Sequence, residues 1–300
     1  MSSLPIQSQA EGELVIRANA SPAGFEQLVV ERLRTDDSLH TVRWFTRSQD
    51  PVMRLGVRHL RRLFEVMCEA NLRSDVQRLD LRQNIWVTDS DEAVAAFRYL
   101  YWRNSTLKAL DVSDTEFCDW GLKLLADAYD DASALLPRSL EELQLNHVWN
   151  FRGDMMTPLI RILKQPAPRC KLRVLSLGEN VFSDESSALL LDAIGSTCRS
   201  LRSLTCNCLP VAGSVDLRRQ WMTAIAASRL QAVVCVCTGV VSCKNANDLE
   251  DILLVNRQKN NPVAQFCAFA MSLRRQYKDV VNSPIFDPNA FSAIRSFLSS

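Results

Sequence analysis

The chain has 300 residues, a length that suits one large domain or two small ones. Hydrophobic residues make up 47% of the chain and charged residues 23%, which is typical of a folded globular protein and excludes a largely disordered one. The formal net charge is +1, so no global field draws the protein to nucleic acid or to an anionic membrane, and binding of either would require a local patch.

The beginning of the chain predicts neither export nor membrane insertion. Residues 1–12 contain no basic start followed by an apolar run, and the first basic residue is Arg17, so we expect neither a secretory signal nor a transit peptide. No stretch approaches about 18 uninterrupted apolar residues, the length that a membrane-spanning helix needs. We therefore expect a cytoplasmic protein, with the nucleus as the alternative, and no membrane partner.

A repeated motif organises most of the chain. Its clearest copy is Leu172-x-x-Leu175-x-Leu177-x-x-Asn180, and Val76 begins a second close copy. Eight copies succeed one another at intervals of 28 to 37 residues, a regularity that chance matches do not produce. In chain order, their first positions are Glu11, Leu39, Val76, Leu107, Leu140, Leu172, Leu201 and Leu230.

Each copy predicts one strand followed by one helix. Counted from the first position of a copy, positions four and six are apolar and positions three, five, seven and eight are mainly polar, which predicts a strand with one buried face. Apolar residues then recur with helical spacing, and we expect Asp184 to cap one of these helices. The predicted buried helix faces comprise Val94, Phe97, Leu100 and Tyr101; Leu122, Leu125 and Ala126; and Leu189, Leu190, Ala193 and Ile194.

The motif resembles the leucine-rich repeat, and the step of about 28–29 residues with a helix in each unit is similar to the ribonuclease-inhibitor-like subtype. The resemblance covers residues 11–241 and implies an α/β solenoid, a horseshoe of about eight units with parallel strands on the concave side and helices on the convex side. In the family, an asparagine at position nine bonds the backbone between units. Here it is present only at Asn19, Asn84 and Asn180, so we expect the other units to be less regular.

The repeat also predicts the domain organisation. We expect residues 1–241 to form the solenoid, with a degenerate repeat or N-terminal cap in residues 1–38. Residues 242–300 are expected to form a helical cap packed on the last repeat, because a terminal repeat would otherwise expose its core face. Phe266, Phe269 and Leu273 lie on one side of one of these expected helices.

The residues do not suggest catalysis. The three histidines have no acidic partner at a recognisable spacing, and the nine glycines form no phosphate-binding loop. Asp80, Asp111 and Asp114 could mimic a catalytic carboxylate pair, but solvated acids on a repeat surface are the favoured interpretation. We predict that the protein is not an enzyme and uses no cofactor, metal or small-molecule substrate.

Ten cysteines are spread over the chain without the Cys-x-x-Cys spacing of a zinc module. Cys206 and Cys208 lie one repeat before Cys235 and Cys237, so repeats in register could gather four sulfurs. Free thiols that fill the core are the favoured interpretation, and a metal or redox site is the alternative.

The polar positions of the strands predict a surface for a protein partner on the concave side. Arginine and aromatic residues anchor many interfaces, so Arg43, Phe45 and Arg82 are the leading candidates. The alternative is a solvated inner face with contacts made by loops or edges. The other candidates on this face are Arg17, Arg78, Asp80, Asp111, Gln144, Asn146 and His147.

A second candidate surface is a basic stripe on a helix expected over residues 51–72. Its arginines are Arg54, Arg58, Arg61 and Arg62, whose spacing places them on one side of the helix. They could dock an acidic partner or RNA phosphates, although a solvated convex face is the favoured interpretation and no aromatic residues interleave them. The expected buried side comprises Leu55, Leu60, Leu63, Phe64 and Met67.

These observations favour a non-enzymatic protein-interaction module, a scaffold or a subunit of a complex, that binds its partner on the concave strand face. One alternative is a regulator of an enzyme, such as a GTPase activator, an inhibitor or a substrate receptor of a ubiquitin ligase. Another is an RNA-associated assembly factor that uses the basic stripe, in which case retention on RNA would decline steeply with salt.

Overall fold

The computed structural model describes residues 6–7, 11–17, 24–45, 56–70, 72–84, 90–148, 156–166, 168–180, 182–207 and 215–236. These ranges contain a nine-stranded sheet whose strands follow one another in chain order. The strand β1 (Ile6–Gln7) is antiparallel to β2, and β2 to β9 are all parallel. The parallel strands are β2 (Glu13–Arg17), β3 (Thr41–Phe45), β4 (Arg78–Asp80), β5 (Ala109–Asp111), β6 (Glu142–Gln144), β7 (Val174–Leu177), β8 (Ser203–Asn207) and β9 (Ala232–Val236).

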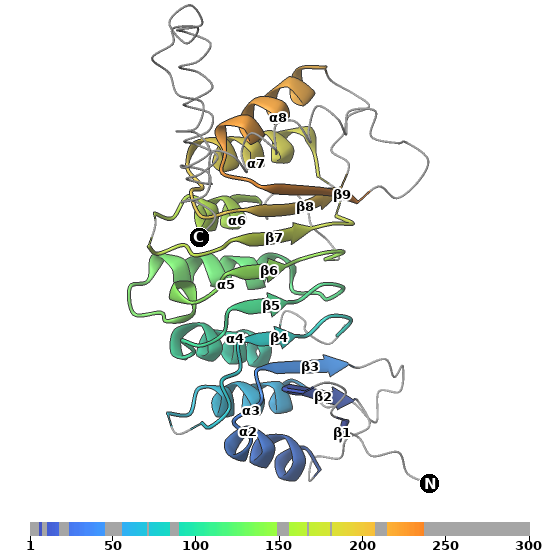
Figure 1. Ribbon diagram of the computed structural model, residues 1–300, viewed down its shortest axis with the longest axis vertical. Helices are drawn as coiled ribbons and strands as arrows, with labels where there is room; N and C mark the ends of the chain where they lie inside the picture. The colour runs from blue at the N-terminus through green and yellow to red at the C-terminus, as the bar shows by residue number, and fades with distance from the viewer. Residues whose placement is uncertain are drawn as a thin grey trace, which may run out of the picture.

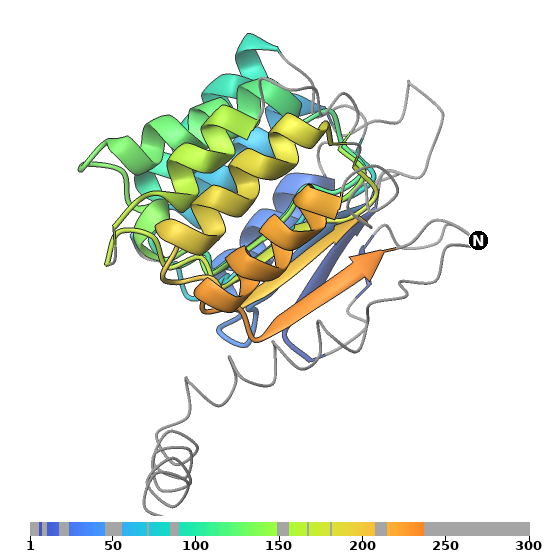
Figure 2. The same ribbon diagram turned by 90° about the horizontal axis from the view of Figure 1, so that it is seen from above.

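The helices cover one face of this sheet and stack on one another in the same order as the strands (Figure 1, Figure 2). We call the opposite face of the sheet the concave face. The predicted solenoid of strand–helix units is confirmed. The helical segments are the π-helix η1 (Phe25–Val30), α2 (Glu31–Thr35), α3 (Val57–Met67), α4 (Asp91–Arg103), α5 (Cys118–Asp130), the 3₁₀-helix η3 (Leu136–Arg138), α6 (Met156–Leu163), α7 (Asp184–Ser196) and α8 (Val215–Ala227).

The strands pair in the register that the repeat predicts. Each position-four residue is the pairing partner of the position-four residue in the next unit, from Leu14 opposite Val42 to Leu204 opposite Val233. In the first seven units these side chains are completely buried against the helices. Parallel strands alternate strictly, so this register places positions three and five of every unit on the concave face.

Aromatic side chains join the units beneath the helices. The ring of Phe97 in α4 lies 5.2 Å from the ring of Phe64 in α3 and 5.2 Å from that of Phe117, and its distance to Trp120 in α5 is 5.5 Å. Gly121 permits this packing, because a Cβ atom there would lie 2.5 Å from the Phe117 ring. Since these rings belong to consecutive units, the core is continuous along the stack and no unit buries its apolar face alone.

Three local predictions were wrong. The helix expected over residues 51–72 ends at Met67, and the Cys68 amide after it donates to the Glu65 carbonyl. The buried positions predicted between residues 60 and 67 of this helix are nevertheless confirmed. The cap of α7 is Ser183, whose hydroxyl accepts from the Ser186 amide at 3.1 Å, and not Asp184. Leu189 does not join the core, since it is 45% exposed.

Some predictions fall on residues that the structure does not describe. These residues include the expected C-terminal cap, residues 242–300, and the position-nine residue Asn19. The division of the chain into a solenoid and a C-terminal cap therefore stays a prediction.

The position-nine asparagines tie consecutive units together. The Asn180 amide group donates to the carbonyls of Leu145 in the preceding unit (2.6 Å) and Leu177 in its own unit (3.0 Å), and its oxygen accepts from the Val148 amide at 2.9 Å. Asn84 is equivalent and donates to the Trp44 carbonyl in the unit before it. All of these groups are buried, so each asparagine satisfies backbone groups that water does not reach.

We expect Asn180→Ala to lower the free energy of unfolding by about 2–3 kcal/mol, because it leaves buried backbone groups of two units without partners. Urea unfolding followed by circular dichroism measures this change. Ser196→Ala, which removes an exposed hydroxyl on α7, is the control and should change the stability by less than about 0.5 kcal/mol. Equal effects of the two substitutions would contradict the coupling of units through Asn180.

Candidate protein-binding face

The concave face begins with a row of position-five side chains brought side by side by the strand register. Arg43, Asp80, Asp111, Gln144 and Ser176 occupy five consecutive strands and are pairing partners in that order. Neighbouring parallel strands lie about 4.8 Å apart, so the charged groups of one strand reach those of the next. The row therefore allows ion pairs between residues that are far apart in the sequence.

Two arginines and two buried carboxylates form what we call the arginine–carboxylate ladder: Arg43, Asp80, Arg82 and Asp111. The Asp80 carboxylate lies 3.0 Å from Arg43 Nε and 2.6 Å from Arg82 Nη2, and Arg82 Nε lies 3.8 Å from Asp111. At its outer end, Arg43 Nη1 lies 3.0 Å from Glu13. Asp80 is 2% exposed and Asp111 is 4% exposed, so the arginines cover the two acids and keep them from water.

In the position-three row, one ion pair joins two strands that are not neighbours. Arg78 Nη2 donates to Glu142 Oε2 at 2.5 Å, although β5 lies between the two strands that contain these residues. The residue at this position of β5 is Ala109, whose small side chain lets the arginine pass over it. Gln144 donates to the other oxygen of Glu142, so the amide and the ion pair hold each other in place.

Amide and hydroxyl groups continue the concave face beyond the ladder. The Asn146 side-chain oxygen accepts from the Ser176 hydroxyl at 2.6 Å and from the Gly178 amide at 2.7 Å. On its other side, the Ser113 hydroxyl accepts from the Asn146 backbone amide at 3.1 Å. Asn146 thus links three consecutive units and holds this part of the face in one arrangement.

Position eight, where each strand leaves the sheet, forms an exposed rim. His147 Nδ1 lies 2.6 Å from Asp114 Oδ1 in the preceding unit; His147 is exposed and Asp114 is partly exposed. Four residues of this rim have positive φ angles between 48° and 63°, a conformation that favours glycine and asparagine. They are Gln83, Asp114, His147 and Glu179.

Burial determines the protonation behaviour of Asp111. Removal from water raises the pKa of this carboxyl group above its usual value of 3.8, and the neighbouring Asp80 also raises it. Hydrogen bonds from Ser113 and the charge of Arg82 lower the pKa but do not cancel the effect of burial. The ladder therefore contains a carboxylate whose charge costs stability in the folded state.

Most predicted contact residues lie together on the concave face, but their state differs from the expectation. Asp80 and Asp111 are buried and ion-paired, so their interpretation as solvated acids was wrong; Asp114 is partly exposed. Arg17 lies in β2 and Phe45 in β3, and their side chains fall outside the described part of the structure. No signal within a single repeat could have revealed the ion pairs of Arg43 with Asp80 and of Arg78 with Glu142, because the two partners belong to different repeats.

Some arginines of the basic stripe form ion pairs within their own helix. Arg61 lies 3.0 Å from Glu65 and Arg62 lies 3.8 Å from the same carboxylate, one helical turn away on α3. Arg58 is exposed, and Arg54 lies outside the described residues. Two of the four arginines are therefore ion-paired on their own helix, and both the solvated face and binding through the stripe stay predictions.

The structure places one pair of cysteines in register. Cys206 on β8 is the pairing partner of Cys235 on β9, and the Cys206 side chain is buried. Cys208 and Cys237 lie outside the described residues. Within the part of the chain that the structure describes, no three metal-ligating side chains gather around one point.

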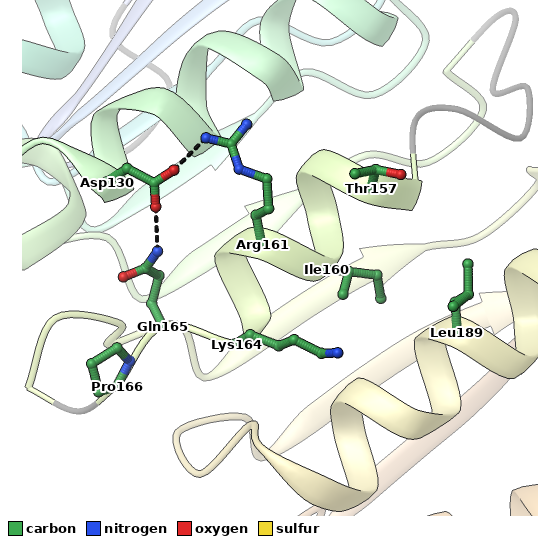
Figure 3. Close-up of a pocket in the computed structure, with 8 residues that line it drawn as sticks. All are labelled: Asp130, Thr157, Ile160, Arg161, Lys164, Gln165, Pro166 and Leu189. Carbon is green, nitrogen blue, oxygen red and sulfur yellow. Dashed lines mark hydrogen bonds and ion pairs between the residues drawn. The ribbon is translucent and has the colours of Figure 1, made fainter.

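A depression of about 590 Å³ opens on the helical side between α5, α6 and α7 (Figure 3). Ile160 and Leu189 supply apolar surface, and Arg161 is ion-paired to Asp130, which also accepts from the Gln165 amide at 2.6 Å. Lys164 is a second cation in the lining, so the depression combines apolar surface with one ion pair and one further basic group. No helix in the described ranges is both long and apolar enough to cross a lipid bilayer.

A solved structure with the same arrangement supports the repeat architecture. The leucine-rich repeat-containing protein LegL7 from Legionella pneumophila is similar over 81% of this chain and 70% of its own, with 15% identity and a TM-score of 0.50. The fold is a leucine-rich-repeat solenoid. The tropomodulin C-terminal domain of Caenorhabditis elegans is also similar, with 16% identity and a TM-score of 0.43. This match covers 57% of this chain and 95% of that domain. Comparisons with models of known families and with curated protein sequences find no match.

We expect Arg82→Met to lower the free energy of unfolding of the solenoid by about 1–3 kcal/mol. The substitution leaves the buried Asp80 and Asp111 carboxylates without the cation between them, and the partial exposure of Arg82 limits the loss. The control Arg61→Met removes an exposed ion pair and should cost less than about 0.5 kcal/mol in the same urea titration. A loss no larger than that of the control would show that the ladder does not stabilise the sheet.

Asp111→Asn should change how the stability of the solenoid depends on pH. Because the pKa of Asp111 is raised in the folded chain, its contribution to stability is full below the usual value of 3.8 and is lost as the pH rises through the raised value. The urea midpoint of the unmodified protein minus that of the variant should therefore decrease as the pH is raised from about 4 to neutral. A constant difference across this range would argue against a buried, titrating Asp111.

Proposed function

We propose that the protein is a non-enzymatic interaction module, a scaffold or a subunit of a complex, that binds a partner protein on the concave face. The observation that carries this proposal is a continuous polar surface that no helix of the described residues covers. On this surface, hydrogen bonds and ion pairs between strands hold side chains such as Arg78 and Asn146 in place.

Such a surface is prepared for binding before a partner arrives. Arginine and glutamate side chains lose rotamer freedom when an interface forms, and this loss weakens association. Here the ion pair of Arg78 with Glu142 and the contacts of Asp80 have already restricted these side chains. A partner that accepts the existing arrangement therefore binds with a smaller entropic penalty than it would on an unstructured surface.

Charge indicates the chemistry of the partner. The described side chains of the concave face include three cations, Arg43, Arg78 and Arg82, and each of them already contacts a carboxylate. Six acids share the face, so the acids outnumber the cations, and we propose a partner segment that is basic and rich in hydrogen-bonding groups. The six acids are Glu13, Asp80, Asp111, Asp114, Glu142 and Glu179.

Because of this charge distribution, the residues that we propose for direct contact differ from the leading candidates of the sequence. Arg43 and Arg82 first stabilise the buried acids, so they are poor probes of binding because their removal disturbs the sheet. Gln144, Asn146 and His147 present polar groups beside them and are the better candidates for direct contact. Arg17 and Phe45 remain candidates at the N-terminal end of the face.

Regulation of an enzyme is the second candidate function. A partner enzyme whose basic surface lies next to its active site would be inhibited or activated by the same concave face, without any catalytic group from the solenoid. RNA binding through the basic stripe is less well supported, because Glu65 engages Arg61 and Arg62. We place the protein in the cytoplasm as part of this proposal.

The rim acids provide the test. The proteins captured from cells by affinity purification are identified by mass spectrometry, and the stoichiometric partner is purified. Its affinity for Asp114→Asn/Glu179→Gln is then measured by calorimetry. Removing two rim charges should weaken binding by about threefold to tenfold and reduce its salt dependence, because both acids face the partner. Asparagine at position 114 tolerates the positive φ angle, so the fold is retained.

The matched control is Glu92→Gln/Glu185→Gln, which removes two exposed acids from the helices α4 and α7. Its affinity for the partner should stay within about twofold of that of the unmodified protein. Equal affinity of the rim variant, or an equal loss in both variants, would refute binding at the concave face.

A further inference from the structure

Basic side chains gather at the amino-terminal edge of the last three strands. The segments that lead from α6 to β7, from α7 to β8 and from α8 to β9 contain seven cations and, in their described residues, no acid. Five of these cations lie within four residues of the start of a strand. We call this surface the basic edge. Its residues are Lys171, Arg173, Arg199, Arg202 and Arg229.

The strand register brings the basic edge together. The amides of Arg202 and Ser203 donate to the Arg173 carbonyl at 2.8 and 2.9 Å, so Arg173 and Arg202 lie next to each other, each just before its own strand. Arg202 Nη1 donates to the carbonyls of Arg199 and Leu201, which fixes its guanidinium close to the backbone. Partial burial, and then the charges of Arg229 and Arg173, lower the pKa of Arg202, so these cations repel one another at short range.

The positive charge of the edge is poorly compensated within the described residues. Arg173 faces Glu141 at 3.7 Å, a long contact on exposed side chains. No carboxylate of the described ranges pairs with Arg199, Arg202 or Arg229.

The ends of the helices account for only part of this charge. The helices α6, α7 and α8 end just before the basic edge, and each helix C-terminus acts as roughly half a negative charge. Three such ends and Glu141 together offset about two and a half of the five cations. Within the described residues, the remaining cations lack a compensating charge, and separating them would relieve their repulsion.

The surface beside the basic edge has room for a polypeptide segment. A depression of about 390 Å³ is lined by Lys108, Glu141, Arg173 and Val174, among other residues, and thus adjoins the edge at Arg173. The edge spans three strands, or about 10 Å, which suits a few carboxylates on an extended chain. The same span reaches only one or two phosphates of a nucleic acid, and its described residues include no aromatic ring on which a base could stack.

We propose that the basic edge is a docking surface for an acidic protein segment, separate from the concave face. Arg199 and Arg229 are exposed and bind the carboxylates of this segment, while Arg173 and Arg202 lie beside them, just before the starts of β7 and β8. Arginine suits this role because its planar guanidinium pairs with a carboxylate through two parallel hydrogen bonds. The solenoid then offers an acid-rich face and a basic edge to two different kinds of partner sequence.

The test uses a fluorescein-labelled peptide in which glutamate alternates with serine, measured by fluorescence anisotropy against the whole chain. The unmodified protein should bind the peptide with an affinity that falls as salt rises. Arg199→Glu/Arg229→Glu should weaken binding by about tenfold or more, because both substitutions reverse a contact charge. The matched control Arg98→Glu/Lys123→Glu makes the same change in net charge on exposed residues of α4 and α5, and should stay within about twofold.

Three results would overturn the proposal: no binding at low salt, an equal loss in both double variants, or tighter binding of a single-stranded oligouridylate of similar length. Hydrogen–deuterium exchange gives the location, since the bound peptide should slow exchange in residues 171–173, 199–203 and 229–232. Circular dichroism verifies the fold, and Arg199→Gln/Arg229→Gln replaces the double reversal if the latter unfolds. The rim variant Asp114→Asn/Glu179→Gln should bind the acidic peptide normally, which separates this proposal from partner binding on the concave face.

Discussion

The in-register stacking of the position-four residues is the interaction on which the rest of the structure depends. Leu79, Leu110, Leu143 and Leu175 are fully buried and lie on successive strands, so the apolar core of each repeat is completed only by its neighbours. Asn180 adds a second constraint, because it bonds backbone groups of the preceding unit as well as its own. Together these contacts fix the register, and the register decides which side chains meet on the opposite face.

The polar face follows from this constraint. Asp80 and Asp111 are neighbours because their strands are in register, and two acids at this spacing require a cation between them. Arg82 supplies it from its position two residues beyond Asp80. A strand surface that would be solvated in an isolated unit thus becomes a network of fixed charges in the assembled stack. The basic edge arises in the same way, since stacking alone brings Arg173 beside Arg202.

The sequence was sufficient to predict the fold and the register, because a periodicity of two within each strand and a repeat of about 30 residues leave few alternatives. It was not sufficient to predict the state of the concave face. Arg78 pairs with Glu142 across an intervening strand, a contact that depends on the small side chain of Ala109. Leu189 has the spacing of a core residue but lies at the edge of the helix face, where packing of the adjacent helices leaves it 45% exposed. Such outcomes depend on neighbouring units and not on any local pattern.

The backbone of the rim limits which side chains can vary there. Asp114, His147 and Glu179 all have positive φ angles, a conformation that costs most residues about 1 kcal/mol and β-branched residues more. Valine, isoleucine and threonine are therefore disfavoured at the point where each strand leaves the sheet, whereas asparagine, aspartate and glycine are tolerated. Divergence of this surface, in nature or by engineering, would thus draw on a small polar set of amino acids. A change of partner would be expected to alter its charge and hydrogen bonding before its hydrophobicity.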